Sequence, residues 1–89
     1  MKLISVTAIW CPSCIVMKSR LEKIKTQCPW LEIEEYNYDK DLAIRSKYNI
    51  GKEIPVFIFI NNFGFEFHRL QGEIDRKDFI KLLEEHKDK

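Results

Sequence analysis

The chain has 89 residues, a length that predicts one domain over residues 1–89. Hydrophobic residues make up 45% of it and charged residues 33%, a balance that excludes a mainly disordered chain. The formal net charge is +1, too small for a surface that neutralises phosphates, so we expect no nucleic-acid partner.

The first predicted elements are a strand and a long helix. Residues 2–10 are rich in β-branched and apolar types, which predicts a strand and not a signal peptide. Apolar residues then recur at steps of three and four, which predicts a helix with one buried stripe, and Pro29 closes it. The stripe consists of Cys14, Met17, Leu21, Ile24 and Cys28.

The middle of the chain predicts a second strand, a short helix and a third strand. Residues 31–38 are strand-like, and Asp39 is the expected N-cap of a helix over residues 40–48. Residues 56–60 are apolar on both faces, which is typical of a central strand covered from both sides.

The last elements are a return strand and a closing helix. A turn at residues 61–64 precedes a strand over residues 65–70. Asp75 is the expected N-cap of a helix over residues 76–86. The order of strand, helix, strand, helix, strand, strand, helix predicts an α/β fold, with a four-stranded mixed sheet and helices on both faces.

Cysteine content and apolar runs bear on the compartment. Three cysteines are too few, and odd in number, for a disulfide-stapled secreted scaffold, so we expect a reducing compartment and a cytoplasmic location. The longest apolar run, residues 56–60, is far shorter than the roughly 18 residues of a spanning helix. We therefore expect no membrane partner. We also expect a monomer.

The chemistry-bearing motif is Trp10-Cys11-Pro12-Ser13-Cys14. Two thiols three residues apart at a helix start can form a reversible disulfide. Closing so short a loop stabilises the fold by only about 2 kcal/mol, which favours a redox-active disulfide over a structural one. With Cys11 as N-cap and Pro12 at the first helical position, the Cys11 sulfur faces free N–H groups. We therefore expect a lowered pKa and the nucleophile role for Cys11, and the resolving role for the shielded Cys14.

The third cysteine is expected to be a small buried hydrophobe. Cys28 lies about 21 Å from Cys14 along a continuous helix, and disulfide partners need Cα atoms within about 7 Å. The same distance argues against a zinc site built from the three cysteines with His68 or His86, so we expect no metal.

Over its whole length the sequence resembles the thioredoxin superfamily. The motif WCPSC carries the resemblance together with the segment IPVFIFINNFGFEFHRLQGEI. The resemblance implies a minimal thioredoxin-like fold with a cis Pro55 and with the backbone of Ile54 beside the redox cysteines. It also implies a substrate-docking surface, made of Trp10, Pro12, Ser13, Ile54 and Pro55.

The sequence departs from the patterns of thioredoxins and glutaredoxins in several respects. Pro12-Ser13 matches neither the Gly-Pro of thioredoxins nor the Pro-Tyr common in glutaredoxins. The strand before the motif lacks the buried carboxylate of thioredoxins, and Glu35, with the strand parity of Ile33, is a candidate inward proton acceptor. Gly72-Glu73 lacks the Gly-Gly pair with which glutaredoxins bind glutathione.

The expected function is that of a thiol–disulfide oxidoreductase that reduces disulfides in partner proteins through a Cys11/Cys14 cycle. The resemblance implies no bound cofactor, and either a thioredoxin reductase or glutathione as the electron donor. One alternative is a glutathione-dependent glutaredoxin. The other is a redox-inert adaptor that binds a partner through Trp10 and Pro55.

Overall fold

One mixed β-sheet forms the centre of the protein in a computed structural model that describes all residues from 1 to 89. The strands lie in the order β2-β1-β3-β4. β1 pairs in parallel with β2 and antiparallel with β3, which pairs antiparallel with β4. Their bounds are Lys2–Thr7 for β1, Glu32–Asn37 for β2, Val56–Ile60 for β3 and Glu66–Gln71 for β4.

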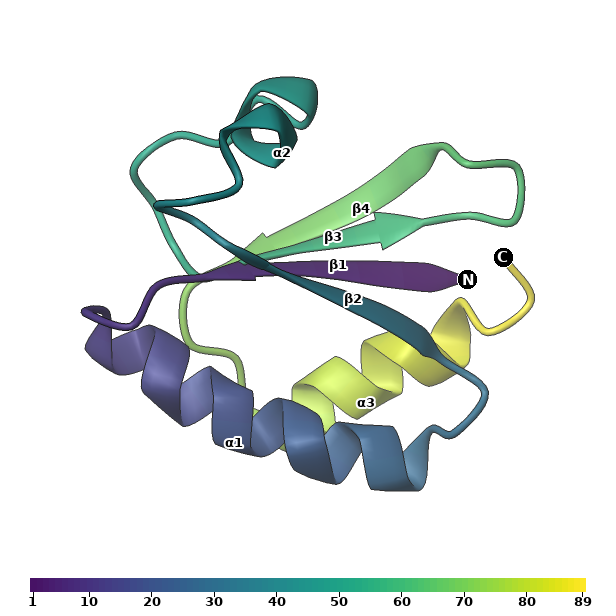
Figure 1. The fold of residues 1–89 in the computed structure, drawn as a ribbon. Helices are drawn as coiled ribbons and strands as arrows, with labels where there is room; N and C mark the ends of the chain where they lie inside the picture. The colour runs from purple at the N-terminus through teal and green to yellow at the C-terminus, as the bar shows by residue number, and fades with distance from the viewer.

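Helices cover both faces of the sheet, as the sequence predicted. α1 and α3 lie together on one face, and α2 lies on the other (Figure 1). Their bounds are Pro12–Gln27 for α1, Leu42–Lys47 for α2 and Arg76–Glu85 for α3. None of the three is long and apolar enough to cross a membrane.

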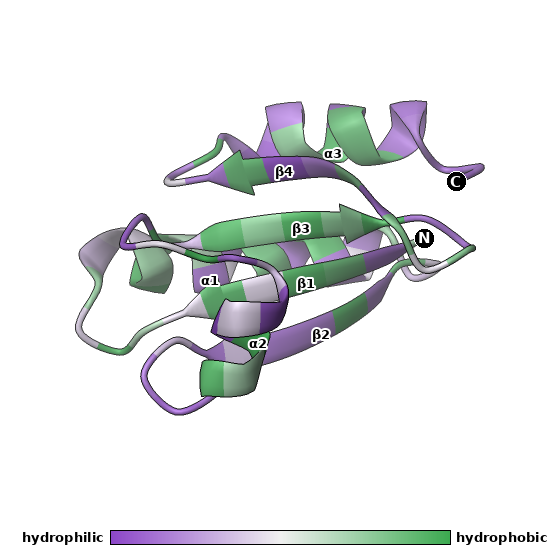
Figure 2. Ribbon diagram, turned by 90° about the horizontal axis from the view of Figure 1, so that it is seen from above, coloured by the Kyte–Doolittle hydropathy of each residue, from purple (hydrophilic) through white to green (hydrophobic).

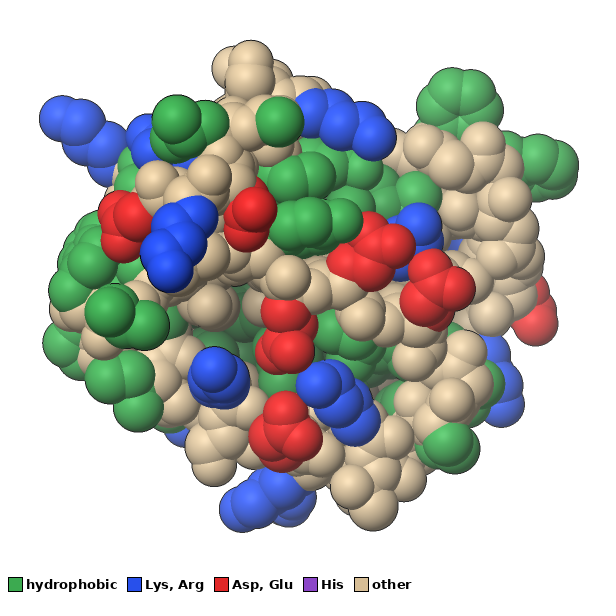
Figure 3. Space-filling view, viewed as in Figure 1, with side chains coloured by type: hydrophobic (Ala, Val, Ile, Leu, Met, Phe, Trp, Pro, Cys, Tyr) green, Lys and Arg blue, Asp and Glu red, His purple; other side chains and the backbone are tan.

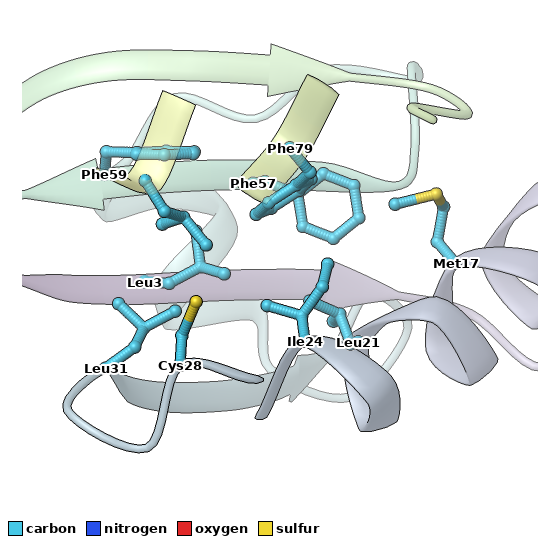
Figure 4. Packing of buried hydrophobic residues seen from close by; sticks show 10 residues of the cluster. Leu3, Met17, Leu21, Ile24, Cys28, Leu31, Phe57, Phe59 and Phe79 are labelled. Atoms are coloured by element: carbon cyan, nitrogen blue, oxygen red, sulfur yellow. The ribbon is translucent and has the colours of Figure 1, made fainter. Parts of the chain in front are cut away.

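The sheet separates two apolar clusters because neighbouring strand residues point to opposite faces. Leu3 belongs to the cluster beneath α1 and α3, whereas Ile4 and Val6 belong to the cluster on the α2 side. Figure 4 shows Phe57, Phe59 and Phe79 meeting in the first cluster, and the predicted stripe of α1 packs there from Met17 to Cys28. Each strand of the central pair thus serves both cores, which explains why β3 is buried at every residue.

The hydropathy of each strand follows its position in the sheet. β1 and β3 are largely apolar, whereas β2 and β4, at the two edges, carry many hydrophilic residues (Figure 2). Acidic and basic side chains alternate over the face drawn in Figure 3, without a large region of one sign. This distribution agrees with the small net charge.

The predicted N-cap of the short helix is wrong. α2 begins at Leu42, and Asp41 stands at its N-cap without a side-chain cap hydrogen bond. The physical reason is a turn in which the side chain of Asn37 accepts hydrogen bonds from the backbone N–H groups of Asp39 and Lys40 at 2.9 and 3.1 Å. That turn delays the helix and leaves the Asp39 carboxylate free for another partner.

Other element ends differ by a few residues. β1 stops at Thr7, because residues 8–11 form a turn in which the N–H of Cys11 donates to the carbonyl of Ala8 at 3.3 Å. The predicted N-cap of the last helix is confirmed, since the Asp75 side chain accepts from the N–H of Lys77 at 3.0 Å.

Candidate functional site

The two motif cysteines lie at the N-terminal end of α1, where the chain enters the helix from the turn after β1. Cys11 is the N-cap with an extended backbone, and Pro12 follows at the start of the helix. The Cys11 sulfur accepts a hydrogen bond from the N–H of Cys14, with 3.2 Å between Sγ and N. The side chain of Cys11 thereby does what a serine or aspartate does at other helix starts.

The helix start favours negative charge on the Cys11 sulfur. Unpaired N–H groups and the helix macrodipole give this end a partial positive charge, and no acidic residue lies in the first turn of α1 to oppose it. Both motif thiols are free in the structure, and the Cys11 side chain is the more exposed, at 6% against 2% for Cys14. The geometry therefore suits Cys11 to attack and Cys14 to follow.

Cys14 is held in its protonated form. Burial, together with its hydrogen bond to Cys11, raises the pKa of the Cys14 thiol to about 12. A thiol must ionise before it can attack a disulfide. Any reaction of Cys14 therefore needs a route by which its proton leaves.

The segment before β3 reaches the motif, because β3 runs antiparallel to β1 and begins beside the end of β1. The Ile54–Pro55 peptide bond is cis, as the resemblance implied. The Cys11 thiol donates a hydrogen bond to the carbonyl of Ile54, with 3.8 Å between Sγ and O. The backbone before β3 and the first motif cysteine thus meet across 43 residues of sequence.

The surface around Cys11 is apolar and open. The side chain of Trp10 is 59% exposed, and Ile9 and Ile15 beside the motif are exposed as well. Pro12 is exposed and Ser13 is half-buried, whereas Pro55 is buried. A small nucleophile surrounded by exposed apolar side chains suits contact with another protein.

Asp39, which the sequence predicted as a helix N-cap, instead contacts a residue of the motif. The indole Nε1 of Trp10 donates a hydrogen bond to its carboxylate, with 2.8 Å between the two atoms. Trp10 also meets the Tyr38 ring edge to face. No local pattern signals this pairing, because the partners are 29 residues apart and belong to two different turns.

Glu35, a candidate for an inward position, does not point inward. Its side chain is 41% exposed, and its carboxylate lies 3.5 Å from the Lys25 ammonium. It nevertheless lines a cavity of about 350 Å³ that extends to Cys14, with Thr7 and Lys18 also in the wall. No group of three or more His, Cys, Asp or Glu side chains is placed to hold a metal ion.

Comparison with known proteins identifies the family of this chain. The thioredoxin family model matches residues 1–85. None of the curated proteins matches the chain.

Solved structures of thioredoxins share the fold. A malaria parasite thioredoxin-2, described as a component of the protein secretion machinery, superposes with a TM-score of 0.88 at 20% identity over 96% of this chain and 82% of its own. Fasciola hepatica thioredoxin gives 0.85 at 22% identity, over 96% and 79%. Mitochondrial thioredoxin 3 from Saccharomyces cerevisiae gives 0.83 at 19% identity, over 94% and 76%.

Proposed function

Because the chain belongs to the thioredoxin family, we propose that it is a thiol–disulfide oxidoreductase that reduces disulfides in partner proteins. The observation that carries this proposal is the hydrogen bond from the Cys14 N–H to the Cys11 sulfur, at the start of α1. It places the Cys11 sulfur, the more exposed of the two thiols, at the positive end of a helix, with a second thiol one helical turn away.

The reaction has two steps. The Cys11 thiolate attacks one sulfur of the partner disulfide, so that a mixed disulfide forms and the other partner sulfur leaves as a thiolate. The Cys14 thiol then loses its proton and attacks Cys11, which forms the Cys11–Cys14 disulfide and releases the second partner sulfur. The protein dithiol is oxidised by two electrons and the partner disulfide is reduced.

Docking uses the open apolar surface beside the nucleophile. The partner segment lies against Trp10 and Pro12, next to the backbone of Ile54 and Pro55, with Ser13 at the rim. The contact between the Cys11 sulfur and the Ile54 carbonyl supports this arrangement, because it places that backbone where a partner sulfur must arrive.

The oxidised protein needs an electron donor. A thioredoxin reductase or glutathione would restore the dithiol, and the two sulfurs carry the electrons without a bound cofactor. The cycle requires a reducing compartment, and we propose the cytoplasm as the location.

Reduction of insulin tests the proposal. Turnover is measured in parallel with NADPH plus a thioredoxin reductase, and with glutathione plus glutathione reductase. Activity in the first system supports the proposal, and activity only in the second would identify a glutaredoxin. A folded protein without activity in both would be an adaptor and would contradict the proposal. Cys11→Ser serves as the inactive control.

A further inference from the structure

In the second step of the proposed cycle, the Cys14 thiol must release its proton. Cys14 is buried, and burial raises the pKa of its thiol to about 12. The strand β1, which leads to the motif, offers no carboxylate. Its buried polar residue is Ser5, whose hydroxyl oxygen has no hydrogen-bond partner. A carboxylate that accepts the Cys14 proton must therefore come from another element.

A cavity connects Cys14 to β2. Its volume is about 350 Å³. One water molecule occupies roughly 30 Å³ in the liquid, so the cavity has room for several. Thr7 and Asn37 in its wall supply polar groups for water, and Glu35 supplies a carboxylate. Water in this cavity can join the buried thiol to the carboxylate at the surface.

The sheet register explains how Glu35 reaches this place. Ser5 of β1 pairs with Glu35 of β2, and Leu3 pairs with Ile33 two residues earlier, so all four side chains belong to the face that α1 covers. Ile33 packs against the core beneath α1. Glu35, farther along the edge strand, opens to solvent and to the cavity.

Charged and titratable groups surround the Glu35 carboxylate on several sides. Lys25 of α1 lies 3.5 Å away and is shared with Glu22, and Lys18 of α1 stands in the cavity wall. Tyr36 lines the same cavity, but its hydroxyl donates to Glu34. Within the cavity wall Glu35 is therefore the carboxylate that can accept a proton.

We propose that Glu35 accepts, through water in this cavity, the proton that Cys14 releases when it resolves the mixed disulfide. The inference rests on the proposed function. The Cys14 sulfur keeps the electron pair of its S–H bond and uses it to form the bond to Cys11, while the partner sulfur leaves with the pair of the broken disulfide. Glu35 then returns its proton to solvent.

If Glu35 acted only through its charge, its neutralisation would have the opposite effect on the rate of the resolving step. A negative charge near Cys14 disfavours its thiolate, so neutralising Glu35 would speed the resolving step if charge alone mattered. Proton acceptance predicts that the same substitution slows it. The direction of the effect therefore separates the two.

The test follows both steps in one experiment. The reduced protein is mixed with an equimolar nitrobenzoate disulfide, whose thiolate product is coloured. Attack by Cys11 releases the first thiolate and resolution by Cys14 releases the second. Glu35→Gln is expected to slow the second phase about ten- to a hundredfold at pH 7 and to leave the first nearly unchanged. Its second phase should also rise more steeply with pH than that of the unmutated protein.

Two variants control for structure and charge. Glu35→Asp keeps the carboxylate and should restore part of the second phase. Glu22→Gln removes the other carboxylate that contacts Lys25 but does not line the cavity, and should change neither phase. A second phase that is unchanged or faster in Glu35→Gln overturns the inference alone. Absence of the first phase in the unmutated protein overturns the proposed function.

Discussion

The Trp10 indole N–H donates a hydrogen bond of 2.8 Å to the carboxylate of Asp39, which joins the turn at the start of the motif to the turn after β2. Tyr38 extends this link, since its ring meets Trp10 edge to face and its hydroxyl donates to the carbonyl of Gly51 at 3.0 Å. The large exposed side chain beside Cys11 is thereby held in one orientation.

Removal of this acceptor should weaken partner docking. Asp39→Ala is expected to raise the KM for insulin about two- to tenfold, because the loss of one hydrogen bond of about 0.5–1.5 kcal/mol frees the indole. The free energy of unfolding should fall by no more than about the same 0.5–1.5 kcal/mol, since the bond lies at the surface. Asp39→Asn retains an acceptor oxygen and is the matched control. An unchanged KM in Asp39→Ala would show that the orientation of Trp10 does not matter.

The assigned roles of the two thiols predict which variant traps partners. Cys14→Ser should accumulate mixed disulfides on Cys11, because the resolving thiol is absent. Cys11→Ser should trap few, since Cys14 is 2% exposed and burial keeps its pKa high. Non-reducing electrophoresis after incubation with a model disulfide protein measures both. Equal trapping by the two variants would mean that either thiol can attack.

Alkaline pH should destabilise the reduced protein. Thiols in the unfolded chain ionise near pH 8.5, whereas burial raises the pKa of Cys14 to about 12 in the folded protein. The stabilisation is complete below about pH 8.5 and is lost as pH rises towards 12, because the unfolded state alone releases its proton. The loss is about 2 kcal/mol by pH 10 for this one thiol.

Urea unfolding at pH 7.5 and pH 10 measures that loss. Cys14→Ala should show a smaller drop in the free energy of unfolding than the unmutated protein, whatever its stability at pH 7.5. Cys28 is a second case with the same sign, since burial raises the pKa of its thiol as well. Parallel drops in Cys14→Ala and the unmutated protein would refute the assignment.

Ser5 predicts a stabilising substitution. Its side chain is 1% exposed and its hydroxyl has no hydrogen-bond partner, so the folded protein bears the cost of desolvating that group. Ser5→Ala should raise the free energy of unfolding by about 1 kcal/mol. Asp75→Ala, which removes a helix cap, should lower it by about the same amount. If Ser5→Ala is clearly destabilising, a buried water satisfies the hydroxyl.

Local patterns accounted for most of the fold. The stripe from Cys14 to Cys28 predicted which face of α1 is buried, and the apolar run 56–60 predicted a central strand, because helix and strand periods decide which side chains share a face. The N-cap position of Cys11 was also predictable, since its hydrogen bond to the Cys14 N–H spans only three residues.

Three features of the site depended on contacts distant in sequence. Asp39 was predicted as a helix cap because aspartate favours that position, but the turn at Asn37 and the indole of Trp10 compete for the same segment. Strand parity placed Glu35 on the face that α1 covers. It could not show that α1 leaves the Glu35 side chain partly exposed. The cis bond at Pro55 followed only from family resemblance.

The elements, the faces they bury and the pair of thiols at a helix start follow from local sequence patterns, because they depend on interactions within one or two helical turns. Two relationships needed the folded chain: the Ile54 carbonyl lies against the Cys11 sulfur, and Cys14 and Glu35 line one cavity. Those relationships arise from the packing of α1 across the sheet, which brings together residues that no local period connects.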